Sequence, residues 1–404
     1  MRNLLTGLDV GTSKVCALVA DASPEGEVAV LGHGVAPCTG LRKGVVVNIE
    51  ATVKAIRAAL DEAERTSGSR VGSVVAGVAG PHIRGLNSHG IVAVRGGEVG
   101  ARDVERVIDA ARAVAIPLDR RVLHILPQQF AVDDQEGVRQ PVGMAGVRLE
   151  ARIHIVTGAQ SYGQNLSKCC ERAGVTPTEL LFEPLASADA ALFPEERELG
   201  VALIDVGGGT TDIIVFHSGA VMHTAVLPLG GNHLTSDIAA GLRTPVTEAE
   251  KLKVAWGAAT SQVVRRDQMV QVAGVGGRDP KAIARKLLAD IIEPRMEEIF
   301  AMAQREIMRS GVADNLASGV VLVGGTSLLE GTQELAERIF GVPVRRGLPV
   351  NLKGMPEELM KPMYTTAAGL ILHQGARGAN HNLARHGKFG RWRSRFNDWV
   401  RDFF

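Results

Sequence analysis

Short runs of apolar residues recur along this chain, separated by amphipathic segments. The clearest runs lie at residues 71–78, 201–204 and 320–323. Apolar runs of this length, bounded by glycine or polar turns, are typical of strands buried on both faces of a sheet. Residues 50–66 instead carry Val53, Ile56 and Leu60 at helical spacing. The alternation of buried strands with amphipathic helices predicts an α/β fold.

Two stretches break this alternation. Residues 81–160 predict short strands at 90–94, 121–125 and 152–157 around a helix at about 103–115, which indicates a small inserted subdomain. Residues 230–312 predict a second inserted lobe that is helical. The expected organisation is two sheet-based halves with inserts. Along the chain the parts are 1–80 (first part of half I), 81–160 (insert), 161–229 (rest of half I and start of half II), 230–312 (lobe) and 313–372 (end of half II and return to half I). Two C-terminal segments follow, a linker at 373–388 and a helix at 389–404.

One polar motif occurs twice, each time directly after an apolar run. The first copy is Asp9 followed by Gly11, Thr12 and Ser13, and the second is Asp205 followed by Gly207, Gly208, Gly209, Thr210 and Thr211. Glycines let backbone N–H groups approach phosphate oxygens, and the hydroxyls add donors. An Asp at each strand end can hold Mg²⁺ through its waters. Two such turns facing each other would clamp a nucleoside triphosphate.

A single turn of this kind is more often only a turn, so the repeat carries the prediction. A third segment agrees with it, because the run at 320–323 ends in Gly324, Gly325 and Thr326. A glycine pair at a helix entry can offer N–H groups to phosphate or ribose. By itself this third segment is an ordinary strand-to-helix turn.

The C-terminal residues differ from the rest of the chain. Residues 373–388 have little apolar content and no periodicity, which predicts a flexible linker. The last 16 residues predict a helix whose apolar face carries Phe389, Trp392, Phe396, Trp399, Val400 and Phe403, with arginines opposite. This pattern is typical of a helix lying in a membrane interface. Docking on the protein's own surface is the alternative, and Asp398 and Asp402 disfavour nucleic acid.

Composition narrows the class of protein. A chain of 404 residues suits two domains, and a net charge of +1 provides no field that would attract nucleic acid. The four cysteines are Cys16, Cys38, Cys169 and Cys170, and none forms a C-x-x-C pair. Free thiols fit a reducing cytoplasm. No run approaches the ~20 apolar residues of a membrane span.

The motifs together resemble the nucleotide site of the actin, Hsp70 and sugar-kinase superfamily. The resemblance rests on the two loops, the segment 183–186 (Glu-Pro-Leu-Ala), the Gly324-Gly325 turn and the segment 364–369 (Tyr-Thr-Thr-Ala-Ala-Gly), in that order. With the early insert, the terminal helix and the segments 125–130, 141–144, 148–150 and 292–295, the chain resembles the FtsA family of bacterial cell-division proteins.

The resemblance implies ATP and Mg²⁺ as ligands. Asp9 and Asp205 would organise Mg²⁺, the two loops would hold phosphates, and Gly324, Gly325 and Thr326 would line the nucleoside. Glu183 matches the acid that positions water in Hsp70-like ATPases, and any hydrolysis would be slow or weak. A Glu-x-x-Lys pair would meet adenine and ribose. Glu250 with Lys253 is favoured, and Glu248 with Lys251 is the other register.

The resemblance also implies partners and a location. The chain would form filaments at the cytoplasmic face of the membrane, at the division septum, and would tether the C-terminal peptide of FtsZ. Arg285 and Arg295, in the lobe, are the expected partner contacts, and later division proteins would bind the inserted subdomain. The alternative is a pilus-assembly or other actin-like ATPase of this superfamily. A sugar kinase would need a substrate domain with a catalytic base, and a chaperone would need a domain after the ATPase.

Overall fold

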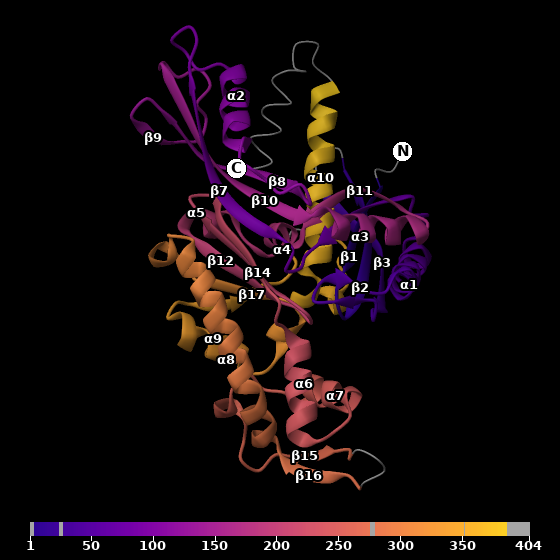
Figure 1. Ribbon diagram of the computed structural model, residues 1–404. Coiled ribbons are helices and arrows are strands. Elements are labelled where there is room, and N and C mark those ends of the chain that lie inside the picture. The colour runs from indigo at the N-terminus through magenta and orange to yellow at the C-terminus, as the bar shows by residue number, and fades with distance from the viewer. Residues whose placement is uncertain (1–3, 24–26, 275–278, 351, 386–404) are drawn as a thin grey trace.

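The computed structural model describes residues 4–23, 27–274, 279–350 and 352–385 (Figure 1). Its centre is two five-stranded sheets. The first, in the order β11-β6-β1-β2-β3, contains β1 (Leu4–Val10), β2 (Lys14–Ala22), β3 (Val28–Pro37), β6 (Ser73–Val78) and β11 (Thr176–Phe182). The second, in the order β14-β13-β12-β17-β18, contains β12 (Val201–Val206), β13 (Thr211–His217), β14 (Ala220–Leu227), β17 (Val320–Val323) and β18 (Val344–Arg346).

The two sheets repeat one topology. In each, three consecutive antiparallel strands (β1-β2-β3 and β12-β13-β14) are followed on the other side of the first strand by two parallel ones. The glycine motif is in each case the turn between the first two strands, so Asp9 lies opposite Cys16 and Asp205 opposite Asp212. The α/β, actin-like arrangement of two related halves is therefore present.

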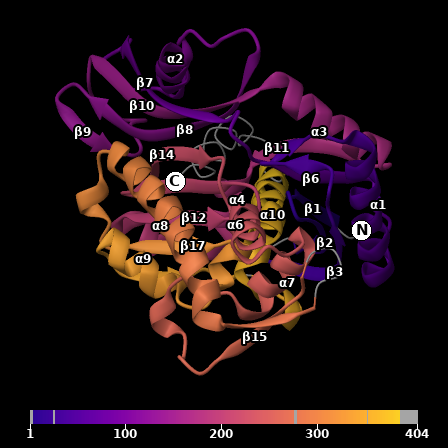
Figure 2. The same cartoon turned by 60° about the horizontal axis from the view of Figure 1, so that its bottom comes forward.

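Two helices lie between the halves. The helix α10 (Thr365–Arg385) packs against α4 (Glu183–Ala191) and β1, and Figure 2 shows it almost end-on between the two sheets. Around this centre lie α1 (Ile49–Ser67), α3 (Gln160–Arg172), α5 (Pro194–Leu199), α9 (Thr332–Phe340) and the short hairpin β4–β5 (Leu41–Arg42, Val45–Val46). Leu8, Val15 and Ile56 belong to the core of the first half, and Ile204, Ile213 and Phe300 to that of the second.

The inserted subdomain is one helix on a four-stranded sheet. The sheet has the order β7-β10-β8-β9, with β7 (Arg84–Ala93), β8 (Arg120–Val132), β9 (Gln135–Val138) and β10 (Arg148–Ala159), and α2 (Ala101–Arg112) covers it. Its strands are longer than the sequence pattern predicted. The contact with β14 of the second half is both polar and apolar. Gln128 donates to the carbonyl of Val221 (2.8 Å) and His154 bonds Thr224 (2.9 Å), while Leu126 and Val156 belong to the same buried apolar cluster as Val221.

The lobe at 230–312 is less purely helical than expected. It comprises α6 (Gly231–Leu242), α7 (Val246–Trp256), α8 (Arg285–Arg309) and, between α7 and α8, the hairpin β15–β16 (Met269–Val272, Lys281–Ala284). Figure 1 places this lobe at the end of the molecule opposite α2 and β9.

The prediction of a flexible linker at 373–388 is wrong over residues 373–385, which continue α10. The helix continues because its buried start gives it a nucleus, and alanine and leucine sustain it. His373 also fixes this stretch, lying 3.7 Å from a carboxylate oxygen of Glu179 and 3.8 Å from one of Asp189. The predicted membrane helix at 389–404 lies outside the described residues. Within them, no helix has the length and apolar content to cross a bilayer.

Replacing Gly369 should loosen the contact between α10 and α4. A Cβ at this position would lie 1.7 Å from the carbonyl oxygen of Ala186, a backbone atom that no rotamer change can move. We expect Gly369→Ala to lower the free energy of unfolding by about 1–3 kcal/mol, as overpacked cores do. Gly163→Ala in α3 is the control, because its Cβ would meet only the Leu180 side chain at 3.3 Å. Urea unfolding followed by circular dichroism compares them. Equal stability of both variants would contradict this packing.

Candidate nucleotide site

The two glycine motifs fold into the same turn. The Gly11 N–H donates to the Lys14 carbonyl (2.9 Å), and the Gly207 N–H donates to the Thr210 carbonyl (3.0 Å). Each turn follows a buried strand and returns directly into its antiparallel neighbour. The duplication read from the sequence is therefore a duplication in structure.

The structure brings the two turns against each other. A Cβ at Gly208 would lie 2.2 Å from Oγ of Ser13, and one at Gly209 would lie 2.5 Å from Oγ1 of Thr12. Only glycine allows this approach, so the glycines of the second turn leave room for the hydroxyls of the first. The result is a cradle of N–H and hydroxyl donors from both halves, as a phosphate group requires.

Four carboxyl groups gather behind the turns. Burial raises the pKa of Asp212 to about 8, and neighbouring Asp205 adds to the shift. Burial, with Asp9 second, raises the pKa of Asp205 to about 6. Burial, followed by Asp9, Asp212 and Asp205, likewise raises the pKa of Glu183. These carboxyl groups repel one another, and a cation or protons must balance them.

Part of that balance is supplied by the chain. The Lys14 ammonium lies 3.3 Å from Oδ2 of Asp9. Burial alone would lower the pKa of Lys14, but Asp9, together with Cys16 and Tyr364, offsets this effect and raises the pKa. Hydroxyls of Ser187 and Thr366 donate to Oδ2 of Asp205 at 3.2 and 3.4 Å. One lysine leaves the cluster with excess negative charge.

The remaining carboxyl groups fit a divalent cation bound through water. Oδ1 of Asp212 is buried and has no hydrogen-bond partner among the described residues. No group of three or more His, Cys, Asp or Glu side chains in the described ranges forms a direct metal cage. Mg²⁺ usually keeps several waters and uses one or two carboxylates plus phosphate oxygens. Asp9 and Asp205 are placed for that role.

Three of the predicted motifs converge on one backbone carbonyl group. The Gly207 carbonyl accepts from the Gly231 N–H (2.9 Å) and from the Thr326 hydroxyl (3.0 Å), which joins three separate motifs. Gly324 has φ 84° and a Cβ there would meet Oδ1 of Asp205 at 2.3 Å, so glycine is required on both counts. The predicted residues Gly324, Gly325 and Thr326 thus lie at the same site.

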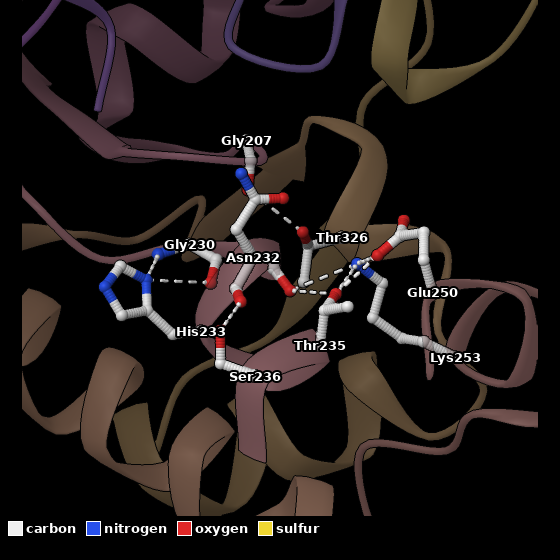
Figure 3. Close-up of polar contacts among 10 residues, drawn as sticks. Gly207, Gly230, Asn232, His233, Thr235, Ser236, Glu250, Lys253 and Thr326 are labelled. Atoms are coloured by element: carbon white, nitrogen blue, oxygen red, sulfur yellow. Dashed lines mark hydrogen bonds and ion pairs between the residues drawn. The ribbon is translucent and has the colours of Figure 1, made fainter. Parts of the chain in front are cut away.

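The structure distinguishes the two possible Glu-x-x-Lys registers. The Lys253 ammonium is buried and donates to the Gly231 carbonyl (3.1 Å), Oγ1 of Thr235 (2.9 Å) and Oε2 of Glu250 (2.7 Å), as Figure 3 shows. Lys251 is exposed and pairs with Glu248 alone (2.7 Å). Only the pair of Glu250 and Lys253 reaches the motif at Gly231 and Thr326.

The two arginines predicted to meet a partner have different positions. Arg285 is buried, donating to the Trp256 carbonyl (2.8 Å), Gln268 (2.9 Å) and Glu330 (2.5 Å). These three acceptors hold the Arg285 guanidinium inside the lobe, where it is not exposed to the predicted partner. Arg295 is partly exposed and pairs with Asp237 (2.7 Å) and Glu298. Neither residue belongs to the nucleotide site.

Sequence reasoning left several site residues without a role. Lys14 and Asp212 directly follow the two glycine motifs, Ser187 directly follows the segment 183–186, and Thr366 lies within the segment 364–369. The signal for Asp212 was available, because residues paired across antiparallel strands point to the same face. Assigning it required knowing that position 205 pairs with 212.

The two related halves define the class of protein by its fold, which is actin-like. Solved structures agree on the fold. A chain of the PilM–PilN type IV pilus biogenesis complex matches with TM-score 0.65 at 17% identity, covering 92% of this chain and 98% of that one. MreB5 of Spiroplasma citri bound to ADP matches with TM-score 0.57 at 14% identity, covering 95% and 99%.

Comparison of sequences is more specific. A family model described as cell division protein FtsA matches residues 202–369, and one described as the SHS2 domain inserted in FtsA matches residues 80–157. The FtsA of Pseudomonas aeruginosa is 50% identical over 92% of this chain and 89% of its own length. The FtsA of Escherichia coli K12 is 40% identical over 100% of this chain and 99% of its own length. The chain therefore belongs to the FtsA family of cell division proteins, and the pilus-assembly alternative is set aside.

The Asp212 carboxyl should make stability depend on pH. Its pKa rises from 3.8 to about 8 on folding, so the folded chain holds a proton that the unfolded chain releases between these values. The stabilisation is complete below about pH 4 and is lost as the pH rises to about 8. Asp212→Asn keeps the group neutral at every pH. The free energy of unfolding of this variant should therefore rise, relative to that of the wild type, by on the order of 1 kcal/mol per pH unit from pH 5 to 8.

Urea unfolding of the nucleotide-free protein at several pH values measures this difference. Asp267→Asn is a matched control, because that side chain is 69% exposed on the lobe. The free energy of unfolding of the control should differ from that of the wild type by the same amount at every pH. A constant offset for Asp212→Asn as well would show that its carboxyl is not held protonated.

Proposed function

We propose that this chain binds Mg²⁺–ATP between its two halves, assembles into filaments on the cytoplasmic face of the membrane and tethers FtsZ there at the division septum. The observation that carries the proposal is the pair of facing glycine turns in a member of the FtsA family. Nucleotide between the halves would link both, so its presence would set their relative position.

Residues around the turns would divide the work of holding the nucleotide. The N–H groups and hydroxyls of both turns would bind phosphate oxygens. The pair of Glu250 and Lys253, with Thr326, would meet the ribose and base. Mg²⁺, held through water by Asp9 and Asp205, would neutralise phosphate charge.

Glu183 would handle a proton. It begins α4, and a Cβ at Gly77 would meet its Cγ at 2.8 Å, so glycine at 77 makes room for it. Bound Mg²⁺ would favour the ionised form of Glu183 by opposing its carboxylate neighbours. The ionised carboxylate could then orient or deprotonate a water, at the modest rate expected of a slow ATPase.

Membrane attachment would come from residues 389–404. Burying each large apolar side chain stabilises by roughly 1.5–3 kcal/mol, and each arginine near an anionic surface adds about 1 kcal/mol. Ordering the segment offsets part of this sum, so one chain would bind reversibly. Filaments link many such segments and raise their effective concentration, which strengthens attachment without new contacts.

Partner binding is assigned to the two outer parts of the molecule. The lobe at 230–312 would receive the FtsZ peptide or the next subunit, with Arg295 as the contact residue. Arg285 is no longer a candidate, because its guanidinium is buried and paired. The inserted subdomain would receive later division proteins. No nucleic-acid partner is proposed.

Lys253→Ala should weaken Mg²⁺–ATP binding by roughly tenfold or more, because a hydrogen bond to a charged group contributes about 1.5–3 kcal/mol. Lys251→Ala, two residues earlier on the same helix, should leave the affinity unchanged, since Lys251 is exposed and pairs only with Glu248. Titration calorimetry with and without Mg²⁺ measures both. An equal effect of the two substitutions would reject the assigned adenine-side register.

Trp399→Glu should release the protein from vesicles of phosphatidylglycerol and phosphatidylethanolamine, because it places a charge on the apolar face of the tail. Trp256→Glu is the matched control, since Trp256 is 44% exposed on the lobe and outside the tail. Co-sedimentation measures binding, and ATP affinity reports whether the core is intact. With FtsZ added, FtsZ should pellet with the wild type but not with Trp399→Glu. FtsZ pelleting with both would refute tethering through the tail.

A further inference from the structure

A second cavity lies away from the nucleotide site, at the outer end of the second half. Its volume is about 680 Å³, within the range of pockets that bury a ligand. The lining includes Leu199 from the end of α5, Ile307 and Met308 from the end of α8, Leu316, and Phe340 and Val342 around the end of α9. We call these residues the α8-end pocket.

The α8-end pocket has an exposed apolar rim. Met308 is 65% exposed and Leu199 58% exposed, whereas Ile307 and Leu316 form a buried floor. Grouped apolar side chains around a hollow mark an interaction site more often than scattered ones do. His217 also lines the hollow, and its Nδ1 is buried without a partner among the described residues.

The charge around the pocket is acidic where it is not already balanced. Asp314 lines the pocket, and Glu195 lies on the helix that supplies Leu199. Neither takes part in an ion pair among the residues that the structure describes. Glu198 and Glu306, nearby, are paired with Arg139 and Arg309. An occupant should therefore present apolar side chains together with positive charge.

The last residues of this chain have that chemistry. The segment 389–404 carries five Phe or Trp residues spaced along one helical face, and four arginines against two aspartates. The helix before it, α10, is linked to the pocket by a chain of side-chain contacts. His373 of α10 lies 3.8 Å from Asp189, and Asp189 is bound by Arg197 of α5 (2.9 Å), two residues before Leu199.

The distance can be covered by the remaining chain. From His373 to Arg385 the helix rises about 18 Å. Residues 386–388 span about 10 Å when extended, and residues 389–404 are about 24 Å long as the helix that the aromatic face requires. A helical 389–404 can therefore return alongside α10 past the level of His373, toward the pocket.

We propose that residues 389–404 dock in the α8-end pocket when no membrane is present, with the aromatic face in the hollow and arginines near Asp314 and Glu195. This inference rests on the proposed membrane role of the tail and adds a second partner for the same face. One apolar face cannot lie in the bilayer and in the pocket together. Docking therefore lowers the apparent membrane affinity by the fraction of tail that is docked, and a bilayer uncovers the pocket.

Cross-linking in the full chain tests the contact. Met308→Cys with Val400→Cys joins the rim of the pocket to the tail, and Leu118→Cys with Val400→Cys is the control, because Leu118 is fully exposed on the inserted subdomain. The four native cysteines are buried, and burial raises the pKa of each thiol, for Cys16 and Cys170 to about 12. Native thiols therefore give little background with a short bismaleimide.

The expected result is an intramolecular link for the Met308 pair at low protein concentration, several-fold above the Leu118 pair, and its loss on adding phosphatidylglycerol vesicles. Equal yields for both pairs, or no link, would overturn the proposal. Links only between two chains would show that a second copy occupies the pocket instead.

A second measurement separates this proposal from the proposed function. Met308→Glu should raise vesicle affinity several-fold by releasing the tail, while Met269→Glu, 58% exposed on the lobe, should not. Unchanged or lower affinity for Met308→Glu would count against docking. If the wild type does not bind vesicles at all but the Met308 cross-link forms, the membrane role fails and the docking stands.

Discussion

Repulsion among carboxyl groups is the constraint on which this structure depends. Asp9 and Asp205 end the first strands of the two halves, Asp212 lies across from Asp205, and Glu183 begins the helix between them. Burial and mutual repulsion raise the pKa of Asp205, Asp212 and Glu183. A cation bound with phosphate at the facing turns would relieve this repulsion. The same charges that limit the stability of the nucleotide-free chain therefore favour its liganded state.

The two halves have the same backbone turn, but the side chains that they bring to the site differ. Both turns close through the same backbone hydrogen bond, but Lys14 stands where the second turn has Thr210. Two residues further along each chain segment, Cys16 of the first half corresponds to Asp212 of the second. One half therefore contributes a cation and the other an additional acid. The two ends of a nucleoside triphosphate also differ chemically, so a site with different groups on its two sides is suited to bind it.

The inserted subdomain and the lobe at 230–312 each contact the central part of the molecule that carries the glycine turns. The inserted subdomain meets β14 through side-chain hydrogen bonds of Gln128 and His154. Leu126 and Val156 of its strands also belong to the same buried apolar cluster as Val221 of β14. The lobe is joined to the nucleotide site through Lys253 and Gly231. The α8-end pocket lies at the far end of α8 from the hairpin β15–β16. A change at the glycine turns thus has a short path to the lobe that would meet a partner.

The sequence by itself determined the strands, the glycine turns and the paired Asp9 and Asp205, because short apolar runs and glycine act locally. Its pattern also located the insert. Tertiary structure decided which side chains meet. Asp212 joined the site through strand register, Lys253 rather than Lys251 through the buried face of α7, and Arg285 was removed from the surface by acceptors up to 45 residues away in sequence. Such contacts depend on chain segments that no local pattern relates, so only the folded molecule could reveal them.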